Sequence, residues 1–348
     1  MKAISEKKEQ IKEIVEKCTD GKSIFGAVLS LSRGNESFTV AAGNMAPESP
    51  YFIASVTKMY VAAMILQLVE NGYIKLDDRI SLYLGTDIVK KLHNYKGKDY
   101  SRRITVRQIM SHCSGLPDYF EQKREDGTSL RGNLAKGKDV SWAFEDVLSF
   151  SRNNQARFIP GHKKRAFYSD TNYQLLGKIL ENVSGKTLSE NIRSRIAVPL
   201  GLKNTYLYEN ASDKSPAPIY YKKEPRFVPN AMRSFTSDGG IVSTADENRI
   251  FLRAFFEGML FQPLFLKDMT HWRKIFFPFR YGMGIARFKL PRIFWPFSPL
   301  PELIGHPGSS GAFAYFYPGK DVYLAGTINQ MSNPGLPYIM LIRALMKL

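Results

Sequence analysis

Strand patterns at both ends of the chain constrain its fold more than any other feature of the sequence. Residues 23–43, SIFGAVLSLSRGNESFTVAAG, predict two strands around a turn at Arg33-Gly34-Asn35. Residues 311–329, GAFAYFYPGKDVYLAGTIN, predict a second pair around Pro318-Gly319. Helical patterns flank these pairs, in the first twenty residues and at 336–348. Because a sheet face must be covered, we expect the two termini to build one antiparallel sheet with the terminal helices packed on it.

The 348 residues are predicted to form a single domain of the α/β (α+β) class with two lobes. The sheet lobe is expected to comprise about 1–55 and 236–348. Helical patterns dominate the middle of the chain, so an inserted helical lobe is expected at about 56–235. A cleft between two lobes is a common place for a functional site.

A buried helix is predicted within YFIASVTKMYVAAMILQLVENG, from Tyr51 to Gly72, because this stretch is apolar nearly all round. Asn71 and Gly72 provide its C-terminal stop. Ser55 stands at its start, where serine is a favourable N-cap. This role does not explain Lys58, since a buried ammonium group loses hydration unless it finds partners.

Ser55 and Lys58 make chemical sense as a nucleophile and its base. Residues three apart share a helix face, so the amine reaches the hydroxyl. Desolvation lowers the pKa of a lysine, and a neutral amine serves as a base for serine. The helix N-terminus adds N–H groups that suit an oxyanion. The S-x-x-K pattern alone has low specificity, because Ser5 and Lys8 repeat it on a charged helix where no site is expected.

Two later stretches place polar residues beside apolar elements. In FYSDTNYQLLGKILENVSG, Tyr168 comes just before a second buried helix, with Asp170 or Thr171 as its expected N-cap. A tyrosine there is either a core aromatic or a functional group. In IGHPGSSGAFAYFYP, glycines lead into a strand. They either allow a bulge or turn, or let a substrate approach the backbone closely.

Three motifs now resemble those of a known superfamily. Ser55-Val56-Thr57-Lys58, Tyr168-Ser169-Asp170 and His306-Pro307-Gly308 occur in the order and at about the spacing of the serine β-lactamase and penicillin-binding-protein superfamily. The leading tyrosine resembles the branch of class C β-lactamases, D-aminopeptidases, D,D-carboxypeptidases and family VIII carboxylesterases. IMSHCSGLPDY and SDGGIVSTADE are similar to two further segments of that branch. The resemblance runs from about residue 20 to the C-terminus and implies an antiparallel sheet flanked by terminal helices, plus a helical lobe.

The resemblance implies a role for each matching residue. Ser55 would be the acylated nucleophile, and Lys58 would accept its proton or hold the base in place. Tyr168 would act as base or proton shuttle, with its phenol pKa lowered by the nearby Lys58. The backbone N–H groups of Ser55 and of Ser309, on the strand after His306, would form the oxyanion hole.

Asp170, His306 and Gly308 are expected at the substrate site, and two of them depart from the family pattern. Asp170 replaces an asparagine, and an ionised aspartate only accepts hydrogen bonds. By pairing with Lys58 it would favour the charged lysine and weaken it as a base. His306 with Pro307 replaces a Lys-Thr pair that helps hold a substrate carboxylate, and a histidine is mostly neutral near pH 7. These departures favour an ester or amide substrate without a free carboxylate at that place.

A basic and aromatic stretch precedes His306. No acidic residue lies between Asp268 and Glu302, whereas eight Trp and Phe residues and six Arg and Lys residues do. YGMGIARFKL, residues 281–290, is interpreted as one sheet strand with the flanking aromatics packed in the core. Alternatively PRIFWPFSPLP, which contains Trp295, forms an apolar wall over the site, or makes a weak contact with an anionic membrane surface.

The partners that the sequence favours are small molecules. The net charge of +17 promotes attraction to anionic surfaces, but the basic residues are scattered and carry no nucleic-acid motif, so no nucleic acid is expected. The histidines and cysteines lack metal-ligand spacing, so we expect neither metal nor cofactor. The charged N-terminus has no apolar h-region. A cytoplasmic protein is therefore expected, with an exported form that has lost its leader as the alternative. The sequence makes no prediction of the oligomeric state.

The sequence thus predicts a serine hydrolase that cleaves a carboxylic ester or a small amide or peptide through an acyl-enzyme on Ser55. The first alternative is a D-stereospecific peptidase or weak β-lactamase acting on cell-wall fragments. The second is a catalytically inactive binding protein that shares the fold, an interpretation that Asp170 favours.

Overall fold

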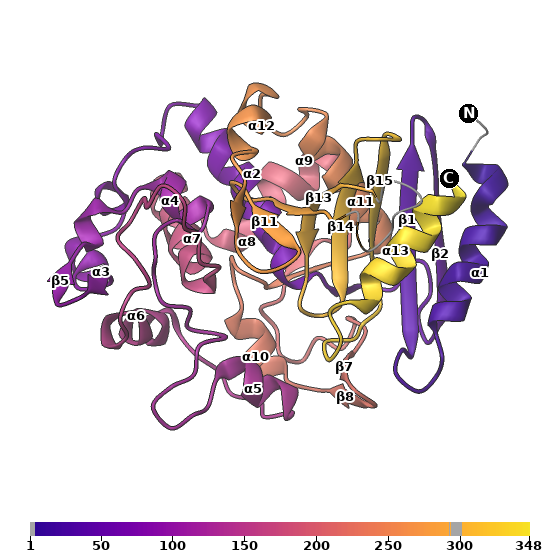
Figure 1. Ribbon diagram of the computed structural model, residues 1–348, viewed down its shortest axis with the longest axis horizontal. Coiled ribbons are helices and arrows are strands. Elements are labelled where there is room, and N and C mark those ends of the chain that lie inside the picture. The colour runs from indigo at the N-terminus through magenta and orange to yellow at the C-terminus, as the bar shows by residue number, and fades with distance from the viewer. Residues whose placement is uncertain (1–3, 292, 294–300) are drawn as a thin grey trace.

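The computed structural model describes residues 4–291, 293 and 301–348. Its central strands are β1 (Gly26–Arg33), β2 (Glu36–Gly43), β10 (Arg273–Lys274), β11 (Phe279–Tyr281), β12 (Ala286–Phe288), β13 (Leu303–Pro307), β14 (Ala312–Tyr317) and β15 (Val322–Thr327). They form one 8-stranded sheet in the order β10-β11-β12-β13-β14-β15-β1-β2, antiparallel at every pairing. β1 lies beside β15, so the predicted sheet built from both termini is confirmed (Figure 1).

Helices cover both faces of this sheet. The terminal helices α1 (Lys8–Cys18) and α13 (Leu336–Lys347) pack on one face, as predicted, and α11 (Ala245–Phe256) packs on the other (Figure 1). Successive strand residues point to opposite faces. On β1, Leu29 and Leu31 therefore join the cluster under the terminal helices, whereas Val28 joins the larger core on the α11 side.

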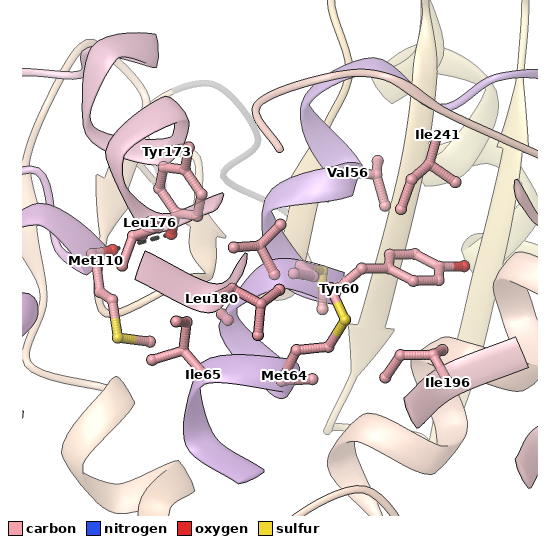
Figure 2. Close-up of a cluster of buried hydrophobic side chains, with 14 of the residues drawn as sticks. Val56, Tyr60, Met64, Ile65, Met110, Tyr173, Leu176, Leu180, Ile196 and Ile241 are labelled. Carbon is pink, nitrogen blue, oxygen red and sulfur yellow. Dashed lines mark hydrogen bonds between the residues drawn. The ribbon is translucent and has the colours of Figure 1, made fainter. Parts of the chain in front are cut away.

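The predicted buried helix is α2 (Thr57–Glu70), in which every residue from Thr57 to Leu66 is buried. It packs against α7 (Asp170–Ser184), and Figure 2 shows side chains of α2 and α7 meeting in this core. The helix ends at Glu70, Asn71 is its C-cap, and Gly72 follows with φ +78°, a conformation that glycine adopts without strain. The predicted C-terminal stop is confirmed.

The remaining elements are short. The other helices are α3 (Thr86–Val89), α4 (Val106–Met110), α5 (Leu130–Ala135), α6 (Phe144–Asn153), α8 (Leu188–Ile192), α9 (Val198–Leu200), α10 (Pro229–Ser234) and α12 (Leu264–Met269). Single 3-10 turns span Ser5–Lys7, Ala54–Val56, Ile80–Leu82 and Ser101–Arg103, and a π turn spans Arg193–Ala197. Three minor sheets are built from β3 (Tyr51–Phe52), β6 (Tyr206–Leu207) and β9 (Ile241–Ser243), from β4 (Asn94–Tyr95) and β5 (Lys98–Asp99), and from β7 (Ile219–Tyr221) and β8 (Glu224–Arg226). Within the described ranges, no helix is both long and apolar enough to cross a bilayer.

The prediction of one strand over residues 281–290 is wrong. β11 ends at Tyr281, the chain turns, and β12 begins at Ala286. A Cβ at Gly282 would collide with the carbonyl oxygen of Met269, and Gly284 has φ +78°, so the two glycines in this segment make a turn rather than a strand. The flanking aromatics are divided, because Phe279 and Phe288 are buried in the core whereas Phe276 and Phe277 are exposed.

Candidate active site

Ser55 lies in the 3-10 turn Ala54–Val56, immediately before α2. The predicted N-cap role is wrong, because α2 begins at Thr57 and Val56 holds the cap position. Ala54 has φ +47°, a strained value for a residue with a Cβ, and such strain clusters at functional sites. The first N–H bonded within the turn is that of Val56, which donates to the Ile53 oxygen at 3.1 Å. The N–H of Ser55 comes before this bond, in the position of the first N–H groups of a helix, which have no partner within the helix.

Lys58 is fully buried, and its ammonium group meets three oxygen atoms. Its Nζ lies 3.1 Å from Ser55 Oγ, 2.6 Å from the Asp238 carbonyl oxygen and 2.6 Å from Asp170 Oδ1. The predicted contact between Ser55 and Lys58 across one helix turn is confirmed. An ammonium group has three protons to donate, so this arrangement uses all of them.

The charge state of Lys58 differs from the neutral amine expected from desolvation. Burial acts to lower the pKa of Lys58, but the Asp170 carboxylate above all, with smaller contributions from Tyr168 and Asp238, raises it above the ordinary value. The expectation of a neutral amine is therefore wrong. The alternative, that Asp170 would pair with Lys58 and keep it charged, is confirmed by the 2.6 Å ion pair.

Tyr168 contributes its ring to the same site, 5.1 Å from Lys58 Nζ. The expected lowering of its phenol pKa is wrong. Burial raises the pKa of Tyr168 and outweighs the lowering by Lys58, and the charge of Asp170 raises it further. The ring packs against the imidazole of His112, with 4.3 Å between ring centroids, which fixes where the phenol points.

The start of α7 is attached to the segment after α4. The N-cap residue of α7 is Ser169, not Asp170 or Thr171 as predicted. The Ser169 hydroxyl donates to the Pro117 oxygen at 2.9 Å, and the Asp170 N–H donates to Asp118 Oδ1 at 3.0 Å. These bonds orient the Asp170 carboxylate toward the interior. Burial, and then the charge of Asp170, raises the pKa of Asp118.

His306, on β13, is buried and neutral, as predicted for a histidine near pH 7. Its Nδ1 lies 2.7 Å from the Pro307 oxygen, and because a carbonyl only accepts, Nδ1 carries the proton. Nε2 then accepts from the Tyr281 hydroxyl at 3.2 Å. Burial, and then the charge of Lys58, lowers the pKa of His306 to about 3. The imidazole therefore supplies no positive charge for a substrate carboxylate.

Gly308 and Ser309 lie in the turn between β13 and β14, so the placement of Ser309 on a strand is wrong. The turn is closed by the Gly311 N–H, which donates to the Gly308 oxygen at 3.1 Å. A Cβ at Gly308 would lie 2.6 Å from the Ile53 oxygen and 3.2 Å from Ala54 Cβ. Only glycine allows this close approach between the turn that carries Ser309 and the turn that carries Ser55.

A cavity of about 620 Å³ joins these residues. The predicted site residues that line it are Ser55, Tyr168, Asp170, His306, Gly308 and Ser309, whereas Trp295 lies outside the described residues. Further carboxylates on its wall are those of Asp118, Glu121 and Asp238. Apolar walls are formed by Phe120, Leu134, Ile219, Met232, Phe235, Met331, Ile275, Phe276, Phe279, Pro337 and Tyr338. In the described part of the chain, no three His, Cys, Asp or Glu residues are grouped to hold a metal ion.

Three contributing residues were not assigned roles from the sequence. Asp238 offers a backbone oxygen to Lys58, His112 supports Tyr168, and Tyr281 holds His306. The first two lie inside SDGGIVSTADE and IMSHCSGLPDY, segments whose resemblance was visible without indicating a contact. Nothing in the sequence around Tyr281 indicates its bond to His306.

Comparisons with known proteins identify relatives of the chain and proteins of similar fold. A putative D-alanyl-D-alanine carboxypeptidase of Salmonella agona (strain SL483) is 32% identical over 156 residues, which cover 44% of this chain but only 33% of that protein. A D-stereospecific amidohydrolase from Streptomyces sp. is 25% identical over 93% of this chain and 94% of its own, with a TM-score of 0.77. A D-amino acid amidase from Ochrobactrum anthropi SV3, 23% identical, shares the fold over 97% of this chain and all of its own, with a TM-score of 0.79. The model of the Beta-lactamase family matches residues 11–343, and the chain belongs to that family.

Proposed function

We propose that the chain is a serine hydrolase that cleaves a carboxylic ester or a small amide through an acyl-enzyme on Ser55. The observation that carries the proposal is the 3.1 Å contact between Ser55 Oγ and the buried ammonium of Lys58, at the wall of the 620 Å³ cavity. A lysine without solvent contact, held against a half-buried hydroxyl on the cavity wall, is a costly arrangement for a purely structural residue.

The proposed reaction uses Tyr168 as the proton acceptor, because Lys58 is held protonated by Asp170. Ser55 Oγ attacks the substrate carbonyl carbon as its proton passes to the phenolate form of Tyr168, which the raised pKa makes a small fraction of the protein near neutral pH and which increases with pH. The N–H groups of Ser55 and Ser309 stabilise the negative charge on the carbonyl oxygen. The bond to the leaving group then breaks, and Tyr168 returns the proton to that group. Water releases the acyl group from Ser55 by the same steps, with Tyr168 again taking the proton.

The surroundings of His306 support a substrate without a carboxylate at that position. The imidazole is neutral and already bonded at both nitrogens, and Pro307 offers neither a hydroxyl nor an N–H. A substrate carboxylate placed there would be desolvated without a positive charge from His306 to compensate it.

The carboxylates on the cavity wall favour a second candidate within the same reaction class. Four carboxyl groups (Asp118, Glu121, Asp170 and Asp238) and two arginines (Arg131 and Arg157) line the cavity. Asp170 pairs with Lys58 and Glu121 with Arg131, whereas among the described residues Asp118 and Asp238 form no ion pair and suit a substrate that carries an ammonium group. An amide of a D-amino acid has such a group and a small leaving group, and its amide replaces the carboxylate. This supports an amino acid amide over a β-lactam, and the similarity to a D-stereospecific amidohydrolase favours the D configuration.

A substrate panel tests the proposal. Rates would be measured on p-nitrophenyl esters, on D- and L-amino acid amides, and on a chromogenic cephalosporin, with Ser55→Ala as control. We expect the wild type, but not Ser55→Ala, to turn over an ester or an amino acid amide. Turnover of the cephalosporin should be weak or absent. Turnover equal in both proteins, or none from a folded wild type, would support the inactive binding protein that the Lys58–Asp170 pair also fits.

A further inference from the structure

The hairpin of β10 and β11 forms one edge of the large sheet, beside the cavity. β10 is the last strand in the sheet order, and its neighbour β11 lies toward the end of the sheet opposite to β2 (Figure 1). In this hairpin Arg273 pairs with Tyr281 and Lys274 pairs with Arg280. The side chains of Ile275, Phe279 and Tyr281 line the cavity, whereas Lys274 and Arg280 are exposed. The hairpin is therefore both a wall of the candidate site and a piece of the outer surface.

The exposed side of the hairpin carries two cations, Lys274 and Arg280. Like charges directly opposite each other destabilise a pair of strands, and Lys274 and Arg280 are such a pair. Across the described residues, neither forms an ion pair, although the neighbouring Arg287 has one with Glu302 at 3.4 Å. A lysine on an edge strand helps to prevent pairing with another sheet. One charged residue is enough to protect the edge strand, so the second cation, Arg280, favours an anionic partner.

The tip of the hairpin is apolar and exposed. Phe276 and Phe277 are 52% and 69% exposed. The Phe276 ring lies 6.3 Å from that of Tyr168 and 5.2 Å from that of Phe279, so this side chain spans the rim between the cavity and the surface. Protection of a sheet edge would not need exposed phenylalanines. Aromatic side chains beside Lys and Arg are the composition of segments that lie in a membrane interface.

We propose that the β10–β11 hairpin binds the surface of an anionic lipid bilayer. Lys274 and Arg280 contact anionic headgroups, and Phe277 inserts among the headgroups and the first acyl carbons. Phe276 then lies where the bilayer meets the cavity, so the site would draw an amphiphilic ester or amide from the membrane. This last step rests on the proposed hydrolase function, whereas the binding of the bilayer does not.

Vesicle co-sedimentation tests the binding. The protein would be mixed with vesicles of phosphatidylcholine alone, or with a quarter of phosphatidylglycerol, at physiological ionic strength. We expect binding to the anionic vesicles only. Lys274→Gln/Arg280→Gln and Phe277→Ser should each weaken the apparent affinity about tenfold or more, from the loss of two surface cations or one inserted ring. Ser55→Ala should bind like the wild type, because binding to the vesicles does not depend on hydrolysis. The binding test therefore remains valid even if the protein hydrolyses no substrate.

Matched controls separate the hairpin from the general positive charge of the protein. Lys163→Gln/Lys164→Gln removes two exposed cations elsewhere, and Phe227→Ser removes a ring that is 75% exposed. Both controls should bind like the wild type. Three results would each overturn the proposal: no binding to anionic vesicles, hairpin variants that bind like the wild type, or equal weakening by hairpin and control variants. Circular dichroism would confirm that every variant is folded.

Discussion

Asp170→Asn should increase the reactivity of Ser55 at neutral pH. The substitution removes the charge that holds Lys58 protonated at 2.6 Å, while asparagine keeps an oxygen that accepts from the ammonium. It also removes the charge that, together with burial, raises the pKa of Tyr168. Both candidate bases therefore become easier to deprotonate, and the expected direction does not depend on which of them takes the proton.

The size of the effect follows from the geometry. Two unit charges 2.6 Å apart attract each other by about 6 kcal/mol at an effective dielectric constant of about 20. This is equivalent to roughly four pKa units. The burial of Lys58 remains in the variant and acts to lower its pKa, so the neutral amine becomes accessible near pH 7. A base with a lower pKa is also a weaker one, so we expect a net gain of about 10-fold to 100-fold rather than the full shift.

The assay is the second-order rate of labelling by a fluorophosphonate probe between pH 6 and 10. The wild-type rate should rise with pH across this range, whereas the Asp170→Asn rate should reach its plateau at lower pH. Glu121→Gln is the matched control, because it removes another carboxylate of the cavity wall whose ion pair is with Arg131 at 3.4 Å. That variant should stay within about threefold of the wild type. Slower labelling of a folded Asp170→Asn variant would show that the charge of Asp170 does not suppress the reactivity of Ser55.

Three further changes test other parts of the site. His306→Asn should make the protein less sensitive to acid. Below pH 6.5 the histidine of the unfolded chain binds a proton, whereas the folded one stays neutral down to about pH 3. Between pH 7 and pH 5 the wild type should therefore lose about 2 kcal/mol more of its free energy of unfolding than the variant, as measured by urea denaturation. Equal losses would contradict the buried neutral imidazole. Gly308→Ala should lower kcat/KM by about 100-fold with little change in Tm, because the alanine Cβ would push the turn that carries Ser309 away from the Ile53 oxygen. An unchanged kcat/KM would exclude that turn from the site. Lys58→Ala should cost about 3–5 kcal/mol in urea denaturation by leaving Asp170 buried without its partner, and Lys58→Ala/Asp170→Ala should recover much of this loss. A double variant no more stable than the single one would argue against an interaction between the two charges.

Periodicity and local spacing account for the features that the sequence predicted well. Strand alternation and turn residues located β1, β2, β14 and β15, and the continuous apolar run located α2. The contact of Ser55 with Lys58 follows from one helix turn, so burial was enough to distinguish it from Ser5 and Lys8. Where glycines interrupt a short apolar run, as in residues 281–290, periodicity does not distinguish one strand from two.

The charge states could not be predicted, because they depend on contacts between distant segments. The Lys58 ammonium is held by Asp170 and by the backbone oxygen of Asp238, 112 and 180 residues away in sequence. The sign of the Tyr168 pKa shift depends on whether burial outweighs the neighbouring ammonium, and a sequence contains neither the burial nor the distance. The bond between Tyr281 and His306 arises from the folding of β11 and β13 beside one cavity.

The most direct test of the central claim is the intact mass of the protein after incubation with a fluorophosphonate probe, beside Ser55→Ala. The account predicts one adduct on the wild type, none on the variant, and a peptide map that places the adduct on Ser55. A folded wild type without an adduct even at alkaline pH, or an adduct that persists in Ser55→Ala, would contradict the assignment of Ser55 as an activated nucleophile.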